Sequence, residues 1–179
     1  MNSRPLLVRL DRFFGKIKAM FSGARIHPSC RISSSAEISV WKGGQIEIGA
    51  KCRIHKGAII TTLKAGRVTI GDDCTVNPYT IIYGPGGVWI GNSVRIAAHS
   101  VIIAANHSFD DPDVPISKQA STRLGITIQD NVWIGAGVRI LDGVEILSGC
   151  VIAAGAVVNR STPERGVYAG VPAKLVKKI

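Results

Sequence analysis

The chain has 179 residues and a formal net charge of +10, with 46% hydrophobic and 19% charged residues. This composition excludes an intrinsically disordered protein, and the length suits one domain with a substantial core. No apolar run approaches the ~20 residues that a membrane-spanning helix needs. The first 25 residues lack the apolar block and cleavage site of a secretion signal, so we expect a cytoplasmic protein.

The positive charge is concentrated at the two ends of the chain. Residues 1–25 carry six Lys or Arg and one acidic residue, and residues 160–179 carry five and one, whereas the middle is nearly neutral. Aromatic residues make up only 6%, so the interleaved basic and aromatic pattern of nucleic-acid binding is missing. We expect no nucleic-acid partner, but a phosphate-bearing ligand at one end and an anionic surface at the other.

The N-terminal segment 1–25 predicts a basic amphipathic helix over residues 3–22. Ser3 is a suitable N-cap, and Pro5 fits the first helical turn. The apolar stripe comprises Leu6, Leu10, Phe13, Phe14, Ile17, Met20 and Phe21. Two interpretations stay open: the helix covers the adjacent end of the domain or another subunit, or it lies on a membrane surface with its cations toward anionic lipid.

An Ile or Val recurs every six residues from residue 26 to residue 158, in runs that begin at 26, 48, 70, 90, 128 and 146. Six residues make neither one nor two helical turns, but they can make a short strand and a corner. Three such units close a three-sided coil. Because the surplus residues between runs always follow the third unit, every insertion falls near one corner. We predict an all-β parallel β-helix of about six coils over residues 26–171.

The interior of such a coil is predicted by the same repeat. The Ile or Val points inward, as does the small residue four positions later. The glycines that follow Ile at 48–49, 70–71, 90–91 and 134–135 are expected at bends with positive φ. A column of free, buried thiols is predicted from one shared slot of the repeat. Its members are Cys30, Cys52, Cys74 and Cys150.

Several blocks resemble the hexapeptide-repeat acyltransferases, in particular the bacterial sugar O-acetyltransferases of the galactoside, maltose, and capsule or O-antigen types. The blocks are NHSF (106–109), PISKQ (115–119), ITIQDNVWIGAGVRILDGVEIL (126–147), VIAAGAVV (151–158) and YAGVPAKLVKKI (168–179). The resemblance implies a left-handed winding, acetyl-CoA as acyl donor, and a homotrimer with active sites between subunits.

One long insertion, residues 108–127, interrupts the coils directly after His107. Transfer of an acyl group to a hydroxyl needs a base, and a neutral imidazole with an ordinary pKa of ~6.5 can serve. Only His107, among the four histidines, stands at the base of a long loop, and it also matches the family's catalytic histidine. Asp110, Asp111, Asp113 or a backbone carbonyl could orient its ring.

Asn77, in the stretch VNPYT, is the second candidate catalytic residue. By resemblance it matches an asparagine beside the acceptor, where its amide could donate to an oxyanion; alternatively it is a corner residue with positive φ. The positions of Asn77 and His107 within their coils are separated by more than one face of the prism. Within one subunit they should therefore lie near different corners, so a shared site would need a neighbouring subunit. The run from Tyr79 to Val88 lacks the carboxylate of the family, so acceptor recognition is expected to differ.

The acyl-CoA site is expected on the last coils and the C-terminal tail. Trp133 would form an apolar wall, while Ala136 and Ala154 match positions whose backbone contacts pantetheine in the family. The basic residues that match phosphate-binding positions are Arg160, Lys174 and Lys177. Residues 172–179 begin with a proline and predict a short C-terminal helix.

Together these features predict an acyl-CoA-dependent O-acyltransferase, with an acetyl donor and a sugar or glycan acceptor. Two alternatives stay open: a sugar N-acyltransferase of the same fold, and a non-catalytic β-helix scaffold. A zinc-dependent carbonic anhydrase of this fold needs three clustered histidines, whereas only His99 and His107 are near each other in the sequence. We therefore predict no metal site.

Overall fold

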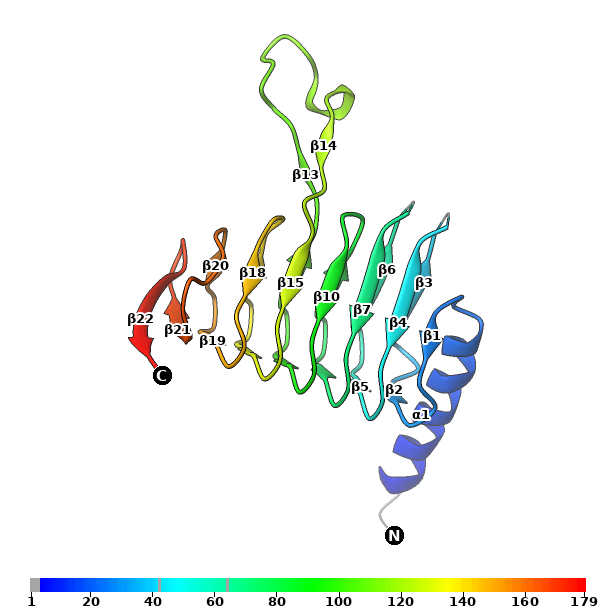
Figure 1. The fold of residues 1–179 in the computed structure, drawn as a ribbon. Helices are drawn as coiled ribbons and strands as arrows, with labels where there is room; N and C mark the ends of the chain where they lie inside the picture. Colours follow the sequence, from blue (N-terminus) through cyan, green and yellow to red (C-terminus); the bar gives the residue numbers. More distant parts are fainter. Residues whose placement is uncertain (1–3, 42, 64) are drawn as a thin grey trace.

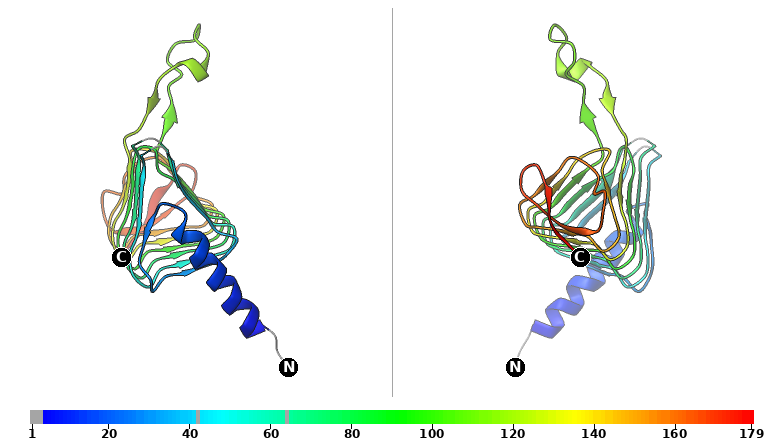
Figure 2. Two further views of the ribbon diagram at one scale, coloured as in Figure 1. Left: turned by 90° about the vertical axis from the view of Figure 1, so that its right-hand side faces the viewer. Right: turned by 60° about the vertical axis from the view of Figure 1, so that its left-hand side comes forward.

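The computed structural model describes residues 4–41, 43–63 and 65–179. It is a left-handed parallel β-helix of about six coils, built from three parallel sheets that we name A, B and C (Figure 1). Helix α1 (Arg4–Met20) crosses the N-terminal end of the rod, and a long hairpin projects from one edge (Figure 2). The predicted fold class and the N-terminal helix are confirmed. The predicted Ser3 cap lies outside the described residues.

Each of the six coils contributes one strand to each sheet, and sheet B also contains two strands of the C-terminal segment, β21 and β22. Sheet A contains β1 (Arg25–Ile26), β4 (Gln45–Ile48), β7 (Arg67–Ile70), β10 (Val88–Ile90), β15 (Ile126–Ile128) and β18 (Glu145–Ile146). Sheet B contains β2 (Arg31–Ile32), β5 (Arg53–Ile54), β8 (Thr75–Val76), β11 (Arg95–Ile96), β16 (Trp133–Ile134), β19 (Val151–Ile152), β21 (Gly166–Ala169) and β22 (Lys174–Lys178). Sheet C contains β3 (Glu37–Val40), β6 (Ile59–Thr62), β9 (Ile81–Tyr83), β12 (Val101–Ile103), β17 (Arg139–Ile140) and β20 (Val157–Val158).

The core is the inside of the prism, where the repeated aliphatic residues stack. Ile54, Val76, Ile96 and Ile134 are register partners on consecutive strands of sheet B, and all are at most 2% exposed. Burial of this column stabilises the fold, because each Å² of apolar surface removed from water contributes about 25 cal/mol. No buried side-chain N or O atom in the described part of the chain lacks a hydrogen-bond partner. The interior therefore follows the six-residue repeat.

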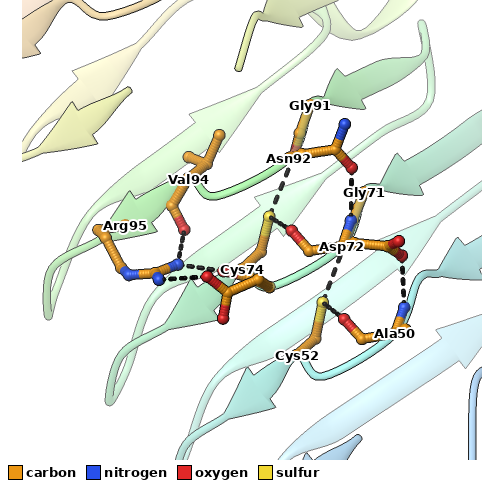
Figure 3. A network of polar contacts seen from close by, with 10 residues as sticks. Ala50, Cys52, Gly71, Asp72, Cys74, Gly91, Asn92, Val94 and Arg95 are labelled. Atoms are coloured by element: carbon orange, nitrogen blue, oxygen red, sulfur yellow. Dashed lines mark hydrogen bonds and ion pairs between the residues drawn. The ribbon is translucent and has the colours of Figure 1, made fainter. Parts of the chain in front are cut away.

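The AB edge, where sheet A passes into sheet B, is held by a ladder of polar contacts (Figure 3). The amide of Ala50 donates to Asp72 Oδ1 at 2.6 Å, and the amide of Asp72 donates to Asn92 Oδ1 at 2.8 Å. Beside this ladder, the Sγ atoms of Cys52 and Cys74 donate to backbone carbonyls of the next coil at 3.0 Å. The four cysteines are buried and free, as predicted.

The glycines after Ile are needed for a different reason from the predicted one. Gly49 and Gly71 do not have positive φ. A Cβ added at either would lie 2.8 Å from the carbonyl carbon of the glycine one coil later, closer than real Cβ contacts. The left-handed corner conformation instead falls two residues further on, at Lys51 and Asp73. The glycines lie at the predicted corner, but the prediction of positive φ was wrong, because close stacking of the coils, not backbone φ, excludes a side chain there.

Helix α1 packs on the first coil through its smallest residues rather than through its apolar stripe. Gly15 and Ala19 are buried, and a Cβ at Gly15 would lie 2.1 Å from the carbonyl oxygen of Ile32. Asp11, one turn earlier on the same side, accepts hydrogen bonds from the Ser34 amide at 3.0 Å and the Ser34 hydroxyl at 2.5 Å. The predicted stripe therefore does not form the contact with the coil.

The C-terminal tail is a strand, which corrects the predicted helix over residues 172–179. Strand β22 pairs antiparallel with β21, with Val167 opposite Lys177 and Ala169 opposite Lys174. In β22 only Leu175 packs against the core, between the exposed Lys174 and Val176. One inward residue between two outward neighbours is compatible with a strand, whose side chains alternate between faces, whereas a packed helix would bury residues three or four apart.

Candidate functional site

His107 lies where the insertion leaves the rod, at the CA edge, where sheet C passes into sheet A. It belongs to β13 (Asn106–His107), which pairs antiparallel with β14 (Ser121–Thr122), with His107 opposite Ser121. These two strands form the stem of the projecting hairpin (Figures 1 and 2). The 3₁₀ turn η1 (Ile116–Lys118) lies in the hairpin between them. The His107 side chain is exposed, so the imidazole is open to solvent and to substrate.

Asp111, one of the three aspartates of the insertion, is hydrogen-bonded within the hairpin. Asp111 Oδ1 accepts from the Asp113 amide at 3.0 Å, and the Gln119 amide group donates to the carbonyl oxygens of Asp111 and Val114. These contacts close the hairpin tip, while among the described residues no hydrogen bond reaches the His107 ring. The interpretation of these aspartates as loop residues is therefore favoured over a role as orienting partner.

Asp142 is a residue that the sequence reading missed. Its carboxylate, only 9% exposed, accepts hydrogen bonds from the amides of Leu124 and Gly125 at 2.9–3.0 Å and from the Thr122 hydroxyl at 3.3 Å. Asp142 thereby fixes the chain just after β14, the strand that pairs with His107. The signal was an aspartate at a CA-edge position directly above a long insertion, which only a coil-by-coil alignment would reveal.

Asn77 lies at the BC edge, where sheet B passes into sheet C, directly after β8. Its side-chain Nδ2 donates to the carbonyl of Ile96, in the next coil, at 2.8 Å. The residue is half-buried, and the positive φ of this corner belongs to Tyr79 rather than to Asn77. One amide hydrogen of Asn77 is thus committed to joining coils, whereas its second hydrogen and its oxygen remain for a ligand.

The two candidate catalytic residues flank one face of the rod. Asn77 is at the BC edge and His107 at the CA edge, with sheet C between them. Ala136 and Ala154 are exposed at the BC edge, two and three coils beyond Asn77, and the Gly155 amide donates to the Ala136 carbonyl at 2.8 Å. The structure therefore brings Ala136 and Ala154 together on the edge that carries Asn77, and it separates His107 from them.

The remaining cofactor candidates occupy two places. On the outward face of sheet B, the register runs from Trp133 through Val151 and Val167 to Lys177, with Lys174 on the same strand β22. Trp133 is 57% exposed, and both lysines are exposed. Arg160 is exposed at the CA edge, after β20. Trp133, Lys174 and Lys177 thus adjoin the alanines of the BC edge, whereas Arg160 shares the edge of His107.

The outward face of sheet C is unusual for its apolar residues. Its middle coils carry Ile59, Ile81, Tyr83, Val101 and Ile103, all half-buried, whereas Glu37 precedes them in register and Arg139 and Val157 follow. The corresponding positions of sheet B carry Arg31, Arg53, Thr75 and Arg95 in the first four coils and Trp133, Val151 and Val167 beyond them. In the described part of the chain, no group of three or more His, Cys, Asp or Glu side chains could hold a metal ion.

Residues 125–160 match the family model described as bacterial transferase hexapeptide (six repeats). The match is confined to these two C-terminal coils and the turn that leads into them. Among similar curated proteins, the Escherichia coli K12 protein named "Putative lipopolysaccharide biosynthesis O-acetyl transferase WbbJ" is 32% identical over 57% of this chain and 56% of its own length. The Saccharomyces cerevisiae protein named "Putative acetyltransferase YJL218W" is 42% identical over 58% of this chain and 52% of its own length. The chain spans about half the length of the curated relatives it matches.

Solved structures are similar to this chain over most of its length. A mutant of AntD, an N-acyltransferase from Bacillus cereus, in complex with dTDP-4-amino-4,6-dideoxyglucose and coenzyme A, has a TM-score of 0.77 at 25% identity and covers 91% of this chain and 87% of its own. A maltose O-acetyltransferase from Clostridium difficile has a TM-score of 0.55 at 23% identity, covering 99% and 90%, and shares the fold.

Proposed function

We propose that this protein is an acyl-CoA-dependent acyltransferase that transfers an acetyl group to a hydroxyl of a sugar or glycan. The observation that carries the proposal is the exposed His107 at the stem of the one long insertion. The relatives named as acetyltransferases, and the coenzyme A in the AntD complex, support the reaction class. The four free thiols and the use of acyl-CoA fit a cytoplasmic location.

In the proposed reaction, a nitrogen of the neutral His107 imidazole takes the proton of the acceptor hydroxyl as its oxygen attacks the thioester carbonyl. The tetrahedral intermediate then collapses, the C–S bond breaks, and the leaving thiolate receives the proton from the imidazolium. The free amide hydrogen of Asn77 is suited to hold the acceptor or the developing oxyanion. Trp133, Ala136 and Ala154 would line the donor, and Lys174 and Lys177 would pair with its phosphates. Arg160, at the CA edge, would reach the same phosphates only from a neighbouring subunit.

The proposed assembly is a homotrimer whose active sites lie between subunits. Sheet C supports it, because an outward apolar ladder such as Ile81 and Ile103 is stabilised by burial against a neighbouring copy. When each copy contacts the next around a three-fold axis, the CA edge of one copy can approach the BC edge of its neighbour. His107 and Asn77, which one copy keeps apart, would then face one site.

The base assignment is tested by following coenzyme A release from acetyl-CoA with a panel of sugars and nucleotide sugars. We expect His107→Ala to lower kcat by about 10²- to 10⁴-fold, and the matched control His27→Ala, an exposed histidine at the N-terminal end, to leave it unchanged. Full activity in His107→Ala would refute the role of His107. The absence of acyl transfer to any acceptor by the wild-type protein would favour a scaffold.

The shared site is tested by co-expressing His107→Ala with Asn77→Ala. If the site lies between subunits, random mixing restores about a quarter of the wild-type activity, because one site in four combines both intact residues. Activity no higher than that of the separate variants would contradict the assembly, and an active Asn77→Ala would contradict the role of Asn77.

A sugar amine is the second candidate acceptor, because AntD, 25% identical over 91% of this chain, is an N-acyltransferase. Treatment of the product with mild base distinguishes the two: an ester is cleaved, and an amide persists.

A further inference from the structure

Helix α1 exposes a continuous set of large apolar side chains. Phe13 is 58% exposed, Met20 80% and Phe21 86%, and the other members of the set are exposed as well. The set consists of Leu6, Leu7, Leu10, Phe13, Phe14, Ile17, Met20 and Phe21. Contiguous apolar surface of this extent is rare on a soluble protein unless something covers it.

This apolar face is directed away from the rod. The side of α1 that packs on the first coil carries Asp11, Gly15 and Ala19, at four-residue spacing. At 3.6 residues per turn, Leu6, Phe13 and Ile17 lie on the opposite side of the helix. Figure 2 shows α1 lying on the outside of the N-terminal end of the prism. In the described part of the chain, no helix is long and apolar enough to cross a membrane.

Cations border the apolar face on the side of the first coil. A groove of about 360 Å³ between α1 and the coil is lined by Arg9, Arg12, Lys16, Arg31 and by Phe13 from the apolar face, and every charged residue in its lining is basic. The Lys16 ammonium also donates to the Pro28 carbonyl at 3.0 Å, which anchors this border.

A second hollow of about 320 Å³ continues the basic surface toward the BC edge. Arg12 and Arg31 line it together with Arg53, His55 and Lys56. The one acidic residue in its lining, Asp11, accepts hydrogen bonds from Ser33 and Ser34. Burial, and then the nearby Arg53 and Arg12, lower the pKa of His55, as a site crowded with cations should.

We propose that α1 is an interfacial helix that binds an anionic lipid bilayer. Its apolar face would enter the boundary between headgroups and acyl chains, while Arg9, Arg12, Lys16 and Arg31 pair with lipid phosphates. A second copy of this chain fits the face poorly, because it would bring the same cations against one another. Binding through α1 does not depend on the proposed acyl transfer and is measured separately from it.

The test is co-sedimentation of the full-length protein with vesicles of phosphatidylcholine alone or mixed with phosphatidylglycerol. We expect strong binding only to the anionic vesicles, and weaker binding as salt rises. Phe13→Ser combined with Ile17→Ser should reduce the partition coefficient about tenfold or more. The matched control is Val176→Ser, an exposed apolar residue on β22 at the far end of the rod, which should bind as wild type.

The contribution of the cations to bilayer binding is tested with a matched pair of double variants. Arg9→Gln with Arg12→Gln should weaken binding to anionic vesicles about tenfold, whereas Arg123→Gln with Arg165→Gln removes the same charge elsewhere and should change it no more than about twofold. Failure of the wild-type protein to bind anionic vesicles would overturn the proposal, as would equal binding to neutral vesicles. A change of oligomeric mass in the Phe13→Ser, Ile17→Ser variant, measured by sedimentation, would assign the face to self-association instead.

Discussion

The coils and helix α1 use apolar residues in opposite ways. In the coils, each Ile of the repeat is enclosed by its counterparts above and below, as Ile134 is between Ile96 and Ile152. In α1 the large apolar residues face outward, and Gly15 makes the contact with the rod. Inside the rod, the neighbouring coils determine which residue is buried. At the end of the rod, the residue that is buried is the one that lets the helix backbone approach the coil most closely.

The largest effect should come from opening the coil interior. Ile134→Ala removes a side chain that is 0% exposed and leaves a cavity, so we expect a loss of about 2–5 kcal/mol in the free energy of unfolding, measured by denaturant titration. Trp133→Ala, one residue away but pointing outward, is the control and should cost far less. Equal losses for the two would mean that the inside–outside alternation does not govern stability.

Substitution of the contact glycine should separate α1 from the rod. Gly15→Ala places a methyl group against the Ile32 carbonyl, and we expect a cost to docking of about 1–3 kcal/mol even though alanine favours an isolated helix. Hydrogen exchange should then show lost protection in α1 and unchanged protection in the coils. Phe14→Ala, on the outward face, should leave α1 docked; simultaneous melting of coils and helix would contradict the separation.

The stem of the insertion should respond to Asp142. Asp142→Ala leaves the amides of Leu124 and of the buried Gly125 without their acceptor, at a cost of about 1–3 kcal/mol, and should increase exchange at residues 121–125. On the proposed mechanism, kcat should fall about tenfold with KM for acetyl-CoA little changed, because His107 loses its fixed position. An unchanged kcat with a loosened stem would show that His107 is positioned by other contacts.

The smallest expected effect is acid release of α1. Burial alone would raise the pKa of Asp11, but hydrogen bonds from Ser34 and Ser33 outweigh it and hold the pKa below its usual value. Because the docked pKa is the lower one, this contribution is complete above the ordinary value of ~3.9 and is lost as the pH falls below it. Hydrogen exchange measured between pH 6 and pH 3 should show that α1 loses protection toward the acid end of this range. Asp11→Asn should abolish this pH dependence.

The sequence predicts the rod well, because one physical rule repeats in it. Six-residue spacing predicts the inward Ile column, the buried cysteines and the edge at which insertions occur, and the structure confirms all three. The reason for Gly49 and Gly71 could not be read, because it depends on the distance between coils rather than on local backbone conformation. The tail was mistaken for a helix because a single strand on the end of a sheet has no repeat to reveal it.

The candidate site was predictable only in part. His107 follows from the position of the insertion, but Asp142 lies 35 residues later in the sequence and meets the stem only after the chain has completed another coil. The orientation of α1 was likewise open, since an apolar stripe has the same spacing whether it faces a core or a membrane. The buried Gly15 shows only that the stripe does not face the coil.

Strand β22 covers the C-terminal end of sheet B. A stack of parallel coils offers open strand edges on which another molecule could continue the stack, and unlimited growth of that kind produces fibres. Here the chain reverses after Ala169, and the last strand of sheet B runs against all the others. A further parallel coil would meet an antiparallel strand on sheet B, although sheets A and C end in parallel strands, β18 and β20. The segment that carries Lys174 and Lys177 thus disfavours continuation of the stack on one of its three faces.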